Sequence, residues 1–228
     1  MCGRYTVSNP GDILPELLGN DEAPEMAARF NVAPSQMAPV VVAGEDGSRR
    51  LVVMRWGLVP HWAEDPEIGQ LMINARAETA AEKPAFRDSF RRRRCVVAAD
   101  GFFEWQKVPG GKQPFLLRLE GGAPFGFAGL WDRWHGRRGR VLETFTVLTT
   151  APNELLAPIH DRMPVILDSA GRDLWLRRPP VADPSALLVP FSALAMEAVA
   201  VSDYVNDPAH DTIRCLQPVL VPRQETLF

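Results

Sequence analysis

The hydrophobic positions of the chain follow two spacings, which predict short helices set among many short strands. Residues 12–18 place four aliphatic side chains on one helical face and precede a Gly-Asn stop signal, so we expect a helix there. Residues 37–43 and 51–56 are rich in Val and Leu and flank Gly-Glu-Asp-Gly, a pattern typical of a β-hairpin. Further strand-like runs span 95–99, 102–107, 114–119, 125–130, 145–150, 164–167 and 196–201.

Helical patterns occur at 78–92, 152–157 and 170–177, without a regular alternation of strand and helix. This order favours an α+β fold in which a central, mostly antiparallel, barrel-like β-sheet is flanked by short helices. We interpret the proline-rich stretch 178–190 as a surface connection and not as a domain boundary. The chain is therefore expected to form a single domain over residues 1–222, followed by a frayed C-terminal tail over 223–228.

The composition is that of a globular protein, because 46% of the 228 residues are hydrophobic and 23% are charged. No apolar run approaches the roughly 20 residues that a membrane-spanning helix needs, and no signal peptide is evident. We expect a cytoplasmic protein with no membrane partner. The three cysteines are widely spaced and the four histidines are scattered, so the sequence predicts neither a disulfide framework nor a metal site.

The net charge of −3 argues against a protein that coats nucleic acid through bulk attraction, because such binding depends on Lys and Arg neutralising phosphates. Any contact with DNA should be a local patch. Candidates are Arg4, Arg76 and Arg162, each close to a residue discussed below, and the run Arg91-Arg92-Arg93-Arg94. That run is equally well interpreted as the solvated end of a helix, where cations suit the dipole.

The start of the chain, Met-Cys-Gly-Arg-Tyr, has a small second residue that permits removal of Met1. Cys2 would then carry a free α-amine beside its thiol. Because an α-amine has a pKa of about 7.7–8.0, part of it is neutral near pH 7 and attacks an aldehyde to form a Schiff base. The thiol can then close onto the imine carbon and give a five-membered thiazolidine. Taken alone, Cys2 is more simply an incidental residue at a terminus.

Asn74 and Arg76 alternate with apolar residues in Ile-Asn-Ala-Arg-Ala-Glu-Thr, residues 73–79, just before a predicted helix. At the end of an extended strand the two polar side chains would point the same way. Asn74 could then orient a sugar or the terminal amine, and Arg76 could make a forked contact with a phosphate. An N-cap followed by an exposed arginine explains the pattern equally well.

Glu104 lies inside the aromatic run Phe-Phe-Glu-Trp. Poor solvation between Phe103 and Trp105 would raise its pKa toward a value useful for proton transfer, which makes it a candidate acid-base group. The two-residue period of a strand supports the opposite reading equally well, with Glu104 facing solvent and the two aromatic rings facing the core.

His160 and Arg162 lie two residues apart between prolines, in Pro-Ile-His-Asp-Arg-Met-Pro at 158–164. This pattern predicts a rigid extended segment with both side chains on one side. His160 could exchange a proton with a sugar ring oxygen, and Arg162 could hold a flanking phosphate. A lone histidine is more often structural.

Taken together, these segments resemble the SRAP family, named for SOS-response-associated peptidases. The similarity extends over almost the whole chain and in family order, which makes the combination far more specific than any one motif. The matching stretches are M-C-G-R-Y at the start, R-F-N-V-A-P at 29–34, W-G-L-V-P-H-W at 56–62, I-N-A-R-A-E-T at 73–79, D-G-F-F-E-W at 100–105 and I-H-D-R-M-P at 159–164.

The resemblance implies a single α+β domain that recognises abasic sites in single-stranded DNA and crosslinks to them through a thiazolidine at Cys2. It implies that Asn74 holds the N-terminal cysteine, that Glu104 assists imine formation, and that His160 helps to open the deoxyribose ring. Arg4, Arg76 and Arg162 would grip phosphates. The resemblance further implies self-removal of Met1, an associated lyase activity, and no metal or organic cofactor. We expect a monomer that associates with the nucleoid when it engages DNA.

One departure from the family pattern follows W-G-L-V-P. Some members carry two adjacent tryptophans there, whereas this chain has Trp62 followed by Ala63. We expect Trp62 to stack against a base beside the lesion, with core packing nearly as good an explanation. Trp56 and Trp105 are predicted to be core residues.

Two other classes of function fit part of the sequence. In an N-terminal-nucleophile amidohydrolase, Cys2 would attack a glutamine-type amide with its own amine as base, but this leaves the other five motifs unexplained. A noncovalent single-strand binder would use the arginines and Trp62, and its complex would dissociate at high salt.

Overall fold

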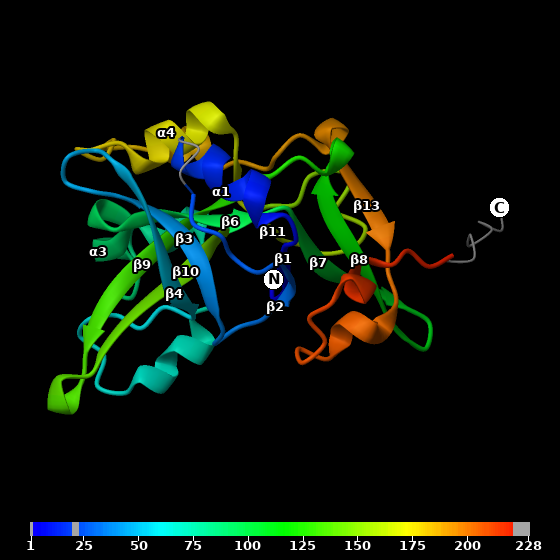
Figure 1. Cartoon of the computed structure of the whole chain (residues 1–228), viewed down its shortest axis with the longest axis horizontal. Coiled ribbons are helices and arrows are strands. Elements are labelled where there is room, and N and C mark those ends of the chain that lie inside the picture. The colour runs from blue at the N-terminus through cyan, green and yellow to red at the C-terminus, as the bar shows by residue number, and fades with distance from the viewer. Residues whose placement is uncertain (1, 20–22, 221–228) are drawn as a thin grey trace.

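A closed barrel of five strands forms the larger part of the fold and lies on the left in Figure 1. The computed structural model describes residues 2–19 and 23–220, so the expected tail lies outside the described residues. Strand β9 pairs with β10 and so closes the order β10-β4-β3-β6-β9. β4 and β10 are parallel, and the other four barrel pairings are antiparallel, which confirms the predicted architecture. The barrel strands are β3 (Met37–Ala43), β4 (Arg49–Trp56), β6 (Arg94–Ala99), β9 (Phe125–His135) and β10 (Val141–Thr150).

A second, antiparallel sheet stands beside the barrel, with the order β13-β8-β7-β1-β2. In Figure 1, β1 and β2 lie near the centre of the molecule, between the barrel strands and β8 and β13. The strands of this second sheet are β1 (Tyr5–Val7), β2 (Arg29–Val32), β7 (Gly101–Val108), β8 (Gly111–Leu119) and β13 (Met196–Ala200). Because β1 is bounded by β2 and β7, the residues that immediately precede β1 are held against the inner part of this sheet.

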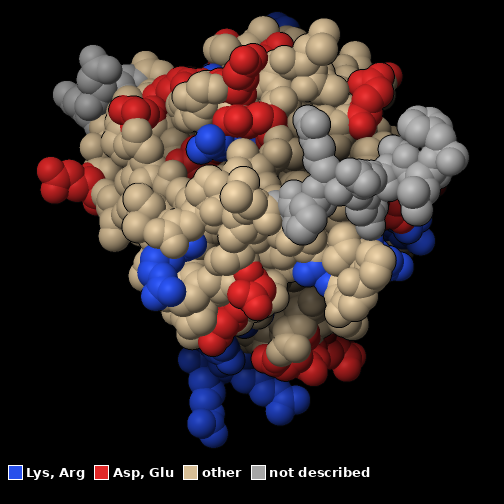
Figure 2. Space-filling view, turned by 90° about the vertical axis from the view of Figure 1, so that its right-hand side faces the viewer, with Lys and Arg blue, Asp and Glu red and all other residues tan. Residues whose placement is uncertain are grey.

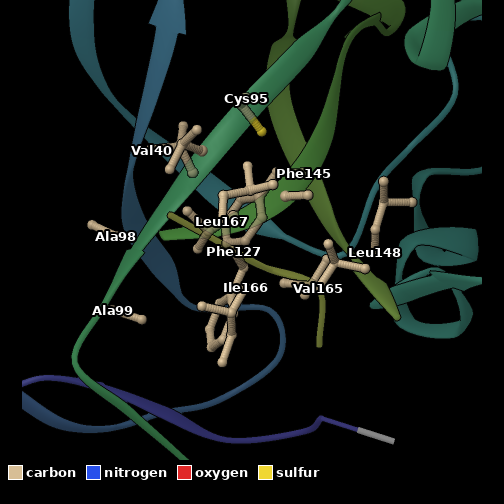
Figure 3. Packing of buried hydrophobic residues seen from close by; sticks show 14 of the residues in the cluster. Val40, Cys95, Ala98, Ala99, Phe127, Phe145, Leu148, Val165, Ile166 and Leu167 are labelled. Carbon is tan, nitrogen blue, oxygen red and sulfur yellow. The ribbon is translucent and has the colours of Figure 1, made fainter. Parts of the chain in front are cut away.

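The core fills the barrel and continues under the second sheet. Figure 3 shows side chains from β3, β6, β9 and β10 gathered around Phe127, with Val165 and Leu167 beside them. The Tyr5 ring of β1 meets Trp56 at 5.1 Å and Phe127 at 5.8 Å, both edge to face. Such aromatic pairs contribute about 0.5–1.5 kcal/mol each beyond the area they bury. Tyr5 therefore fixes β1, and the chain start beside it, against the barrel.

Three further strands are short and depend on the barrel: β5 (Asn74–Arg76), β11 (Met163–Pro164) and β12 (Ile166–Leu167). β5 runs parallel to β10, with Asn74 opposite Val147, and β11 pairs with the same strand at Thr149 and Thr150. The 73–79 and 158–164 motifs contain β5 and β11, respectively, and are thereby brought to one end of β10.

Within the described residues, four α-helices lie on the outside: α1 (Pro10–Leu18), α2 (Ala77–Ala80), α3 (Arg87–Arg92) and α4 (Ser169–Leu176). The predicted helices at 12–18 and 170–177 are confirmed as α1 and α4, and α1 ends at Gly19 with φ +73°. The predicted helix 78–92 is wrong as one element, because Pro84 disfavours helical geometry at Lys83 and splits it into α2 and α3.

The predicted helix at 152–157 is also wrong, because the structure has turns there. The Asn153 carbonyl accepts from Ala157, but Pro158 has no N–H with which to continue the ladder. Short 3₁₀ turns complete the described chain: η1 (Pro66–Leu71), η2 (Glu120–Gly122), η3 (Arg137–Gly139), η4 (Ser185–Leu187), η5 (Ala193–Ala195), η6 (Asp203–Asn206) and η7 (Ile213–Leu216).

Candidate active site

The four residues predicted to carry chemistry converge from four parts of the chain. Cys2 precedes β1, Asn74 begins β5, Glu104 lies within β7, and His160 is in the segment before β11. The Asn74 Nδ2 atom donates to the Cys2 carbonyl oxygen at 2.8 Å, and His160 Nε2 lies 3.9 Å from Glu104 Oε2. The sheet register completes the group, because the Phe103 N–H donates to the Arg4 carbonyl and so sets Glu104 beside the start of the chain.

Cys2 is fully buried. Its Sγ atom lies 3.9 Å from the Arg4 carbonyl oxygen. Burial, with a smaller contribution from the Glu104 charge, raises the pKa of the Cys2 thiol. The sulfur is therefore protonated near neutral pH, and a thiol in this state needs a nearby base before it can act as a strong nucleophile.

Asn74 holds the backbone of Cys2 through its side-chain nitrogen and leaves its side-chain oxygen for a further contact. Its Nδ2 atom is used by the Cys2 carbonyl, whereas its buried Oδ1 atom has no hydrogen-bond partner among residues 2–19 and 23–220. A buried acceptor without a partner costs free energy, so a donor brought to this place would be bound favourably. An amine N–H or a sugar hydroxyl fits that requirement.

Glu104 is buried, with 2% of its surface exposed, and so is its neighbour Phe103. Both faces of β7 are covered at this point, so the solvent-facing interpretation of Glu104 is wrong. Burial raises the pKa of the Glu104 carboxyl to about 7. Near neutral pH the group therefore exchanges a proton in either direction at little cost.

The His160 ring is oriented by the backbone that follows it. The Arg162 N–H donates to His160 Nδ1 at 3.0 Å, and an Asp161 carboxylate oxygen lies 3.0 Å from the same atom. Nδ1 of the neutral ring thus has both a backbone donor and a carboxylate within reach, whereas Nε2 faces Glu104. Burial lowers the pKa of His160, which favours this neutral form.

Arg4 already donates within the protein, which the sequence did not reveal. Its guanidinium reaches Asn31 Oδ1 at 3.1 Å and the carbonyl oxygens of Val205 and Asn206 at 2.8 and 3.2 Å. Asn31 in turn donates to three carbonyl groups of the segment 205–210. Asn31 stands within R-F-N-V-A-P, and its complete burial is the signal that marks it as an organising residue.

Arg162 also makes contacts within the protein, whereas Arg76 is exposed. Arg162 forms a forked ion pair with Glu78 and donates to the Thr149 carbonyl oxygen. Arg76 is exposed, and within the described residues its guanidinium takes part in no ion pair. Of the three arginines predicted to contact phosphates, Arg76 is thus the most accessible to a ligand, and a contact between any of them and DNA stays a prediction.

The arginine run 91–94 divides between surface and core. Arg91 and Arg92 are exposed at the end of α3, as expected of a solvated helix end. Arg94 is buried and stacks over the Trp175 ring at 4.8 Å, and burial lowers its pKa to about 10. The face in Figure 2 shows acidic and basic side chains scattered among uncharged ones, in keeping with the net charge of −3.

The three tryptophans discussed above differ in how far they are buried. Trp56 is buried, which confirms the prediction, and its Nε1 donates to the Ile73 carbonyl just before Asn74. Trp62 is 52% exposed, so core packing does not account for it, and Ala63 behind it is buried. Trp105 is half-buried and donates to Asn206 Oδ1. Stacking of Trp62 on a base stays a prediction.

The described residues hold neither a metal-binding cluster nor a membrane-spanning helix. Residues 2–19 and 23–220 contain no cluster of three His, Cys, Asp or Glu side chains arranged to hold a metal ion. No helix in the same ranges has the length and hydrophobicity needed to cross a membrane.

Among known proteins, the chain is similar to the members of one family. A family model described as "SOS response associated peptidase (SRAP)" matches residues 1–208. The chain belongs to the SRAP family. Relatives of this SRAP chain are named abasic site processing proteins. YoqW of Bacillus subtilis (strain 168) is 44% identical over 220 residues, covering 93% of this chain and 97% of that protein. HMCES of Pongo abelii is 31% identical over 277 residues, covering 99% of this chain and 78% of that protein.

Solved structures agree with this assignment. An X-ray structure of a protein from Bacteroides thetaiotaomicron superposes on the SRAP chain with a TM-score of 0.81 and 27% sequence identity. The match covers 96% of this chain and 100% of that one. The fold is therefore that of the family throughout the barrel and the second sheet.

Proposed function

We propose that this SRAP protein captures abasic sites in single-stranded DNA by forming a thiazolidine with Cys2 after removal of Met1, and so shields the lesion. The observation that supports it most directly is the convergence of Cys2, Asn74, Glu104 and His160 from distant parts of the chain. The names of the relatives support the substrate class. Removal of Met1 concerns a residue outside the described part of the structure.

The proposed reaction has two bond-forming steps. First, the Cys2 α-amine adds to the aldehyde carbon of the opened sugar, and loss of one water molecule gives the imine. Second, the thiol sulfur bonds to the imine carbon while its proton passes to the nitrogen, which closes the five-membered ring. No oxidant or cofactor is consumed, and each protein molecule reacts once.

Each proton transfer has a suitable group. Glu104, with a pKa of about 7, can take a proton from the attacking amine and return it to the departing hydroxyl. His160 Nε2 can relay a proton between the Glu104 carboxyl and the ring oxygen as the sugar opens. Asn74, through its bond to the Cys2 carbonyl and its buried Oδ1, would hold the amine in place. Arg4, Arg76, Arg162 and Trp62 are proposed to contact the DNA on either side.

We further propose that the chain removes its own Met1 and has a secondary lyase activity. In the lyase reaction, the imine promotes loss of a proton from C2′ and rupture of the C3′–O bond. We also propose that the protein acts as a monomer in the cytoplasm and joins the nucleoid when it engages DNA.

The decisive experiment is the intact mass of the purified protein before and after incubation with a single-stranded oligonucleotide that carries one abasic site. We expect a chain without Met1 that gains the mass of the oligonucleotide less one water, in a heat-stable adduct. Cys2→Ala should abolish the adduct, whereas Cys215→Ala, which removes a buried thiol in another part of the chain, should retain it. An equal yield from Cys2→Ala, or crosslinking by a chain that keeps Met1, would refute the proposal.

A further inference from the structure

The guanidinium of Arg162 is held by Glu78 in a forked ion pair. Its two terminal nitrogens lie 2.6 and 2.8 Å from the two Glu78 carboxylate oxygens, and one of them also donates to the Thr149 carbonyl at 2.5 Å. The Arg162 side chain is only 16% exposed. Two parallel hydrogen bonds fix both the distance and the plane of the guanidinium, which a single contact would not do.

This pair joins the two segments that carry half of the candidate active site. Glu78 stands in α2, four residues after Asn74 on a continuous β5–α2 segment. Arg162 stands two residues after His160, and its own N–H donates to His160 Nδ1. Thr149 lies between the two, because β10 pairs there with Arg76 on one side and with Pro164 on the other. A displacement of Arg162 would therefore be transmitted to the His160 ring.

The pair also limits what Arg162 can bind. Both terminal nitrogens already donate to Glu78 or Thr149, and the arginine hydrogen bonds are the main cause of the lowered pKa of the Glu78 carboxyl. A phosphate that took the same two nitrogens would have to displace a carboxylate of like charge. Arg76 lies on the same segment and is exposed, so it offers a phosphate a contact without that competition.

We infer that Glu78 is a positioning residue of this reaction: it clamps Arg162, and through the Arg162 backbone it keeps His160 in register with Asn74. On this view Arg162 serves the reaction from within the protein in addition to the phosphate contact proposed for it above, for which the second Nη1 proton is not used by Glu78. The inference rests on the proposed function, because it concerns the rate of the same crosslinking reaction.

The test uses the full chain and single-turnover crosslinking to abasic single-stranded DNA over a range of DNA concentrations. Glu78→Gln removes the charge but leaves the size of the side chain, and we expect the maximal rate constant to fall by roughly ten- to a hundredfold, as misplacement of a reacting group does. The DNA concentration that gives half the maximal rate should change by less than about twofold, and the final yield of adduct should remain complete.

Two variants strengthen the test. Glu78→Asp keeps the carboxylate and should restore part of the lost rate, whereas Arg162→Lys keeps the charge but loses the fork and should be as slow as Glu78→Gln. Glu82→Gln, an exposed glutamate in the turn after α2, is the matched control and should react at the unaltered rate.

The opposite role for Arg162 predicts the opposite result. If Glu78 merely competes with phosphate for Arg162, Glu78→Gln should crosslink at an undiminished maximal rate and reach half of it at a lower DNA concentration, which would overturn the inference. A reduced final yield with an unchanged rate would also overturn it, because this result indicates partial unfolding. If the unaltered protein forms no adduct, the proposed function fails, and the inference fails with it.

Discussion

Glu104→Gln should change how the stability of the protein depends on pH. The carboxyl has a pKa of about 7 in the folded protein and about 4.5 when unfolded, because burial disfavours its charged form. Between these values the folded state keeps a proton that the unfolded state releases. Stability therefore falls as pH rises through this window, and above pH 7 the full cost is present.

The size of the effect follows from the difference between the two pKa values. The loss of folding stability caused by ionisation of Glu104 amounts to about 3 kcal/mol at alkaline pH, and about 2 kcal/mol of it develops between pH 5 and pH 8. A glutamine at this position does not ionise, so it brings no pH-dependent loss of stability. We therefore expect the free energy of unfolding of Glu104→Gln, relative to that of the unaltered protein, to rise by about 2 kcal/mol over this interval.

Denaturant unfolding of both proteins at about pH 5 and pH 8 measures this quantity. Glu64→Gln removes an exposed carboxylate and serves as the control. A stability difference that stays within about 0.5 kcal/mol across the interval would show that Glu104 is not buried in the charged form at pH 8, and the reasoning would be wrong. The same variant should slow crosslinking by roughly 10²- to 10⁴-fold, the usual contribution of a positioned acid-base group.

Three more predictions concern other parts of the molecule. Cys2→Ser keeps the amine but not the thiol, so its imine should not close, and gel assays should show more strand cleavage and less heat-stable adduct. Arg76→Ala should lower the salt dependence of binding to single-stranded DNA by about 0.7 in the logarithmic slope, measured by titration at several salt concentrations; an unchanged slope would exclude a phosphate contact. Gly57→Ala should lower the free energy of unfolding by about 1–3 kcal/mol, since Gly57 has φ +117° and a Cβ there would lie 2.5 Å from the Gly69 carbonyl oxygen; Gly111→Ala, in open space, is the control.

The sequence predicted those elements whose stabilising contacts are local. The helix at 12–18 and the hairpin of β3 and β4 follow directly from spacing and turn residues. The short strands β1 and β2 escaped prediction, because three or four residues form a strand only when distant chain segments supply the partners. Local patterns also predicted one helix over 78–92 and another at 152–157, whereas Pro84 and Pro158 interrupt the hydrogen-bond ladder there.

The identity of the candidate site residues could be predicted, but their mutual geometry could not. The motifs pointed to Asn74 and Glu104 by residue type and family pattern, yet the period of two left the direction of Glu104 open. Its burial depends on the start of the chain and the His160 segment, which meet β7 only in the folded protein. The internal contacts of Arg4 and Arg162 were missed for the same reason, since the two carbonyl groups that accept from Arg4 lie about 200 residues away in sequence.

The burial of Cys2 bears on the order of the proposed steps. Because burial raises the pKa of the thiol, very little thiolate exists near neutral pH, and the sulfur is a poor first nucleophile. An α-amine has a pKa within about one unit of neutral pH, so a useful fraction of it is ready to attack. The amine should therefore form the imine first, and that imine then places an electrophilic carbon one ring closure from the sulfur. A thiol kept protonated until this moment is also shielded from oxidation, which suits a protein that uses its nucleophile once.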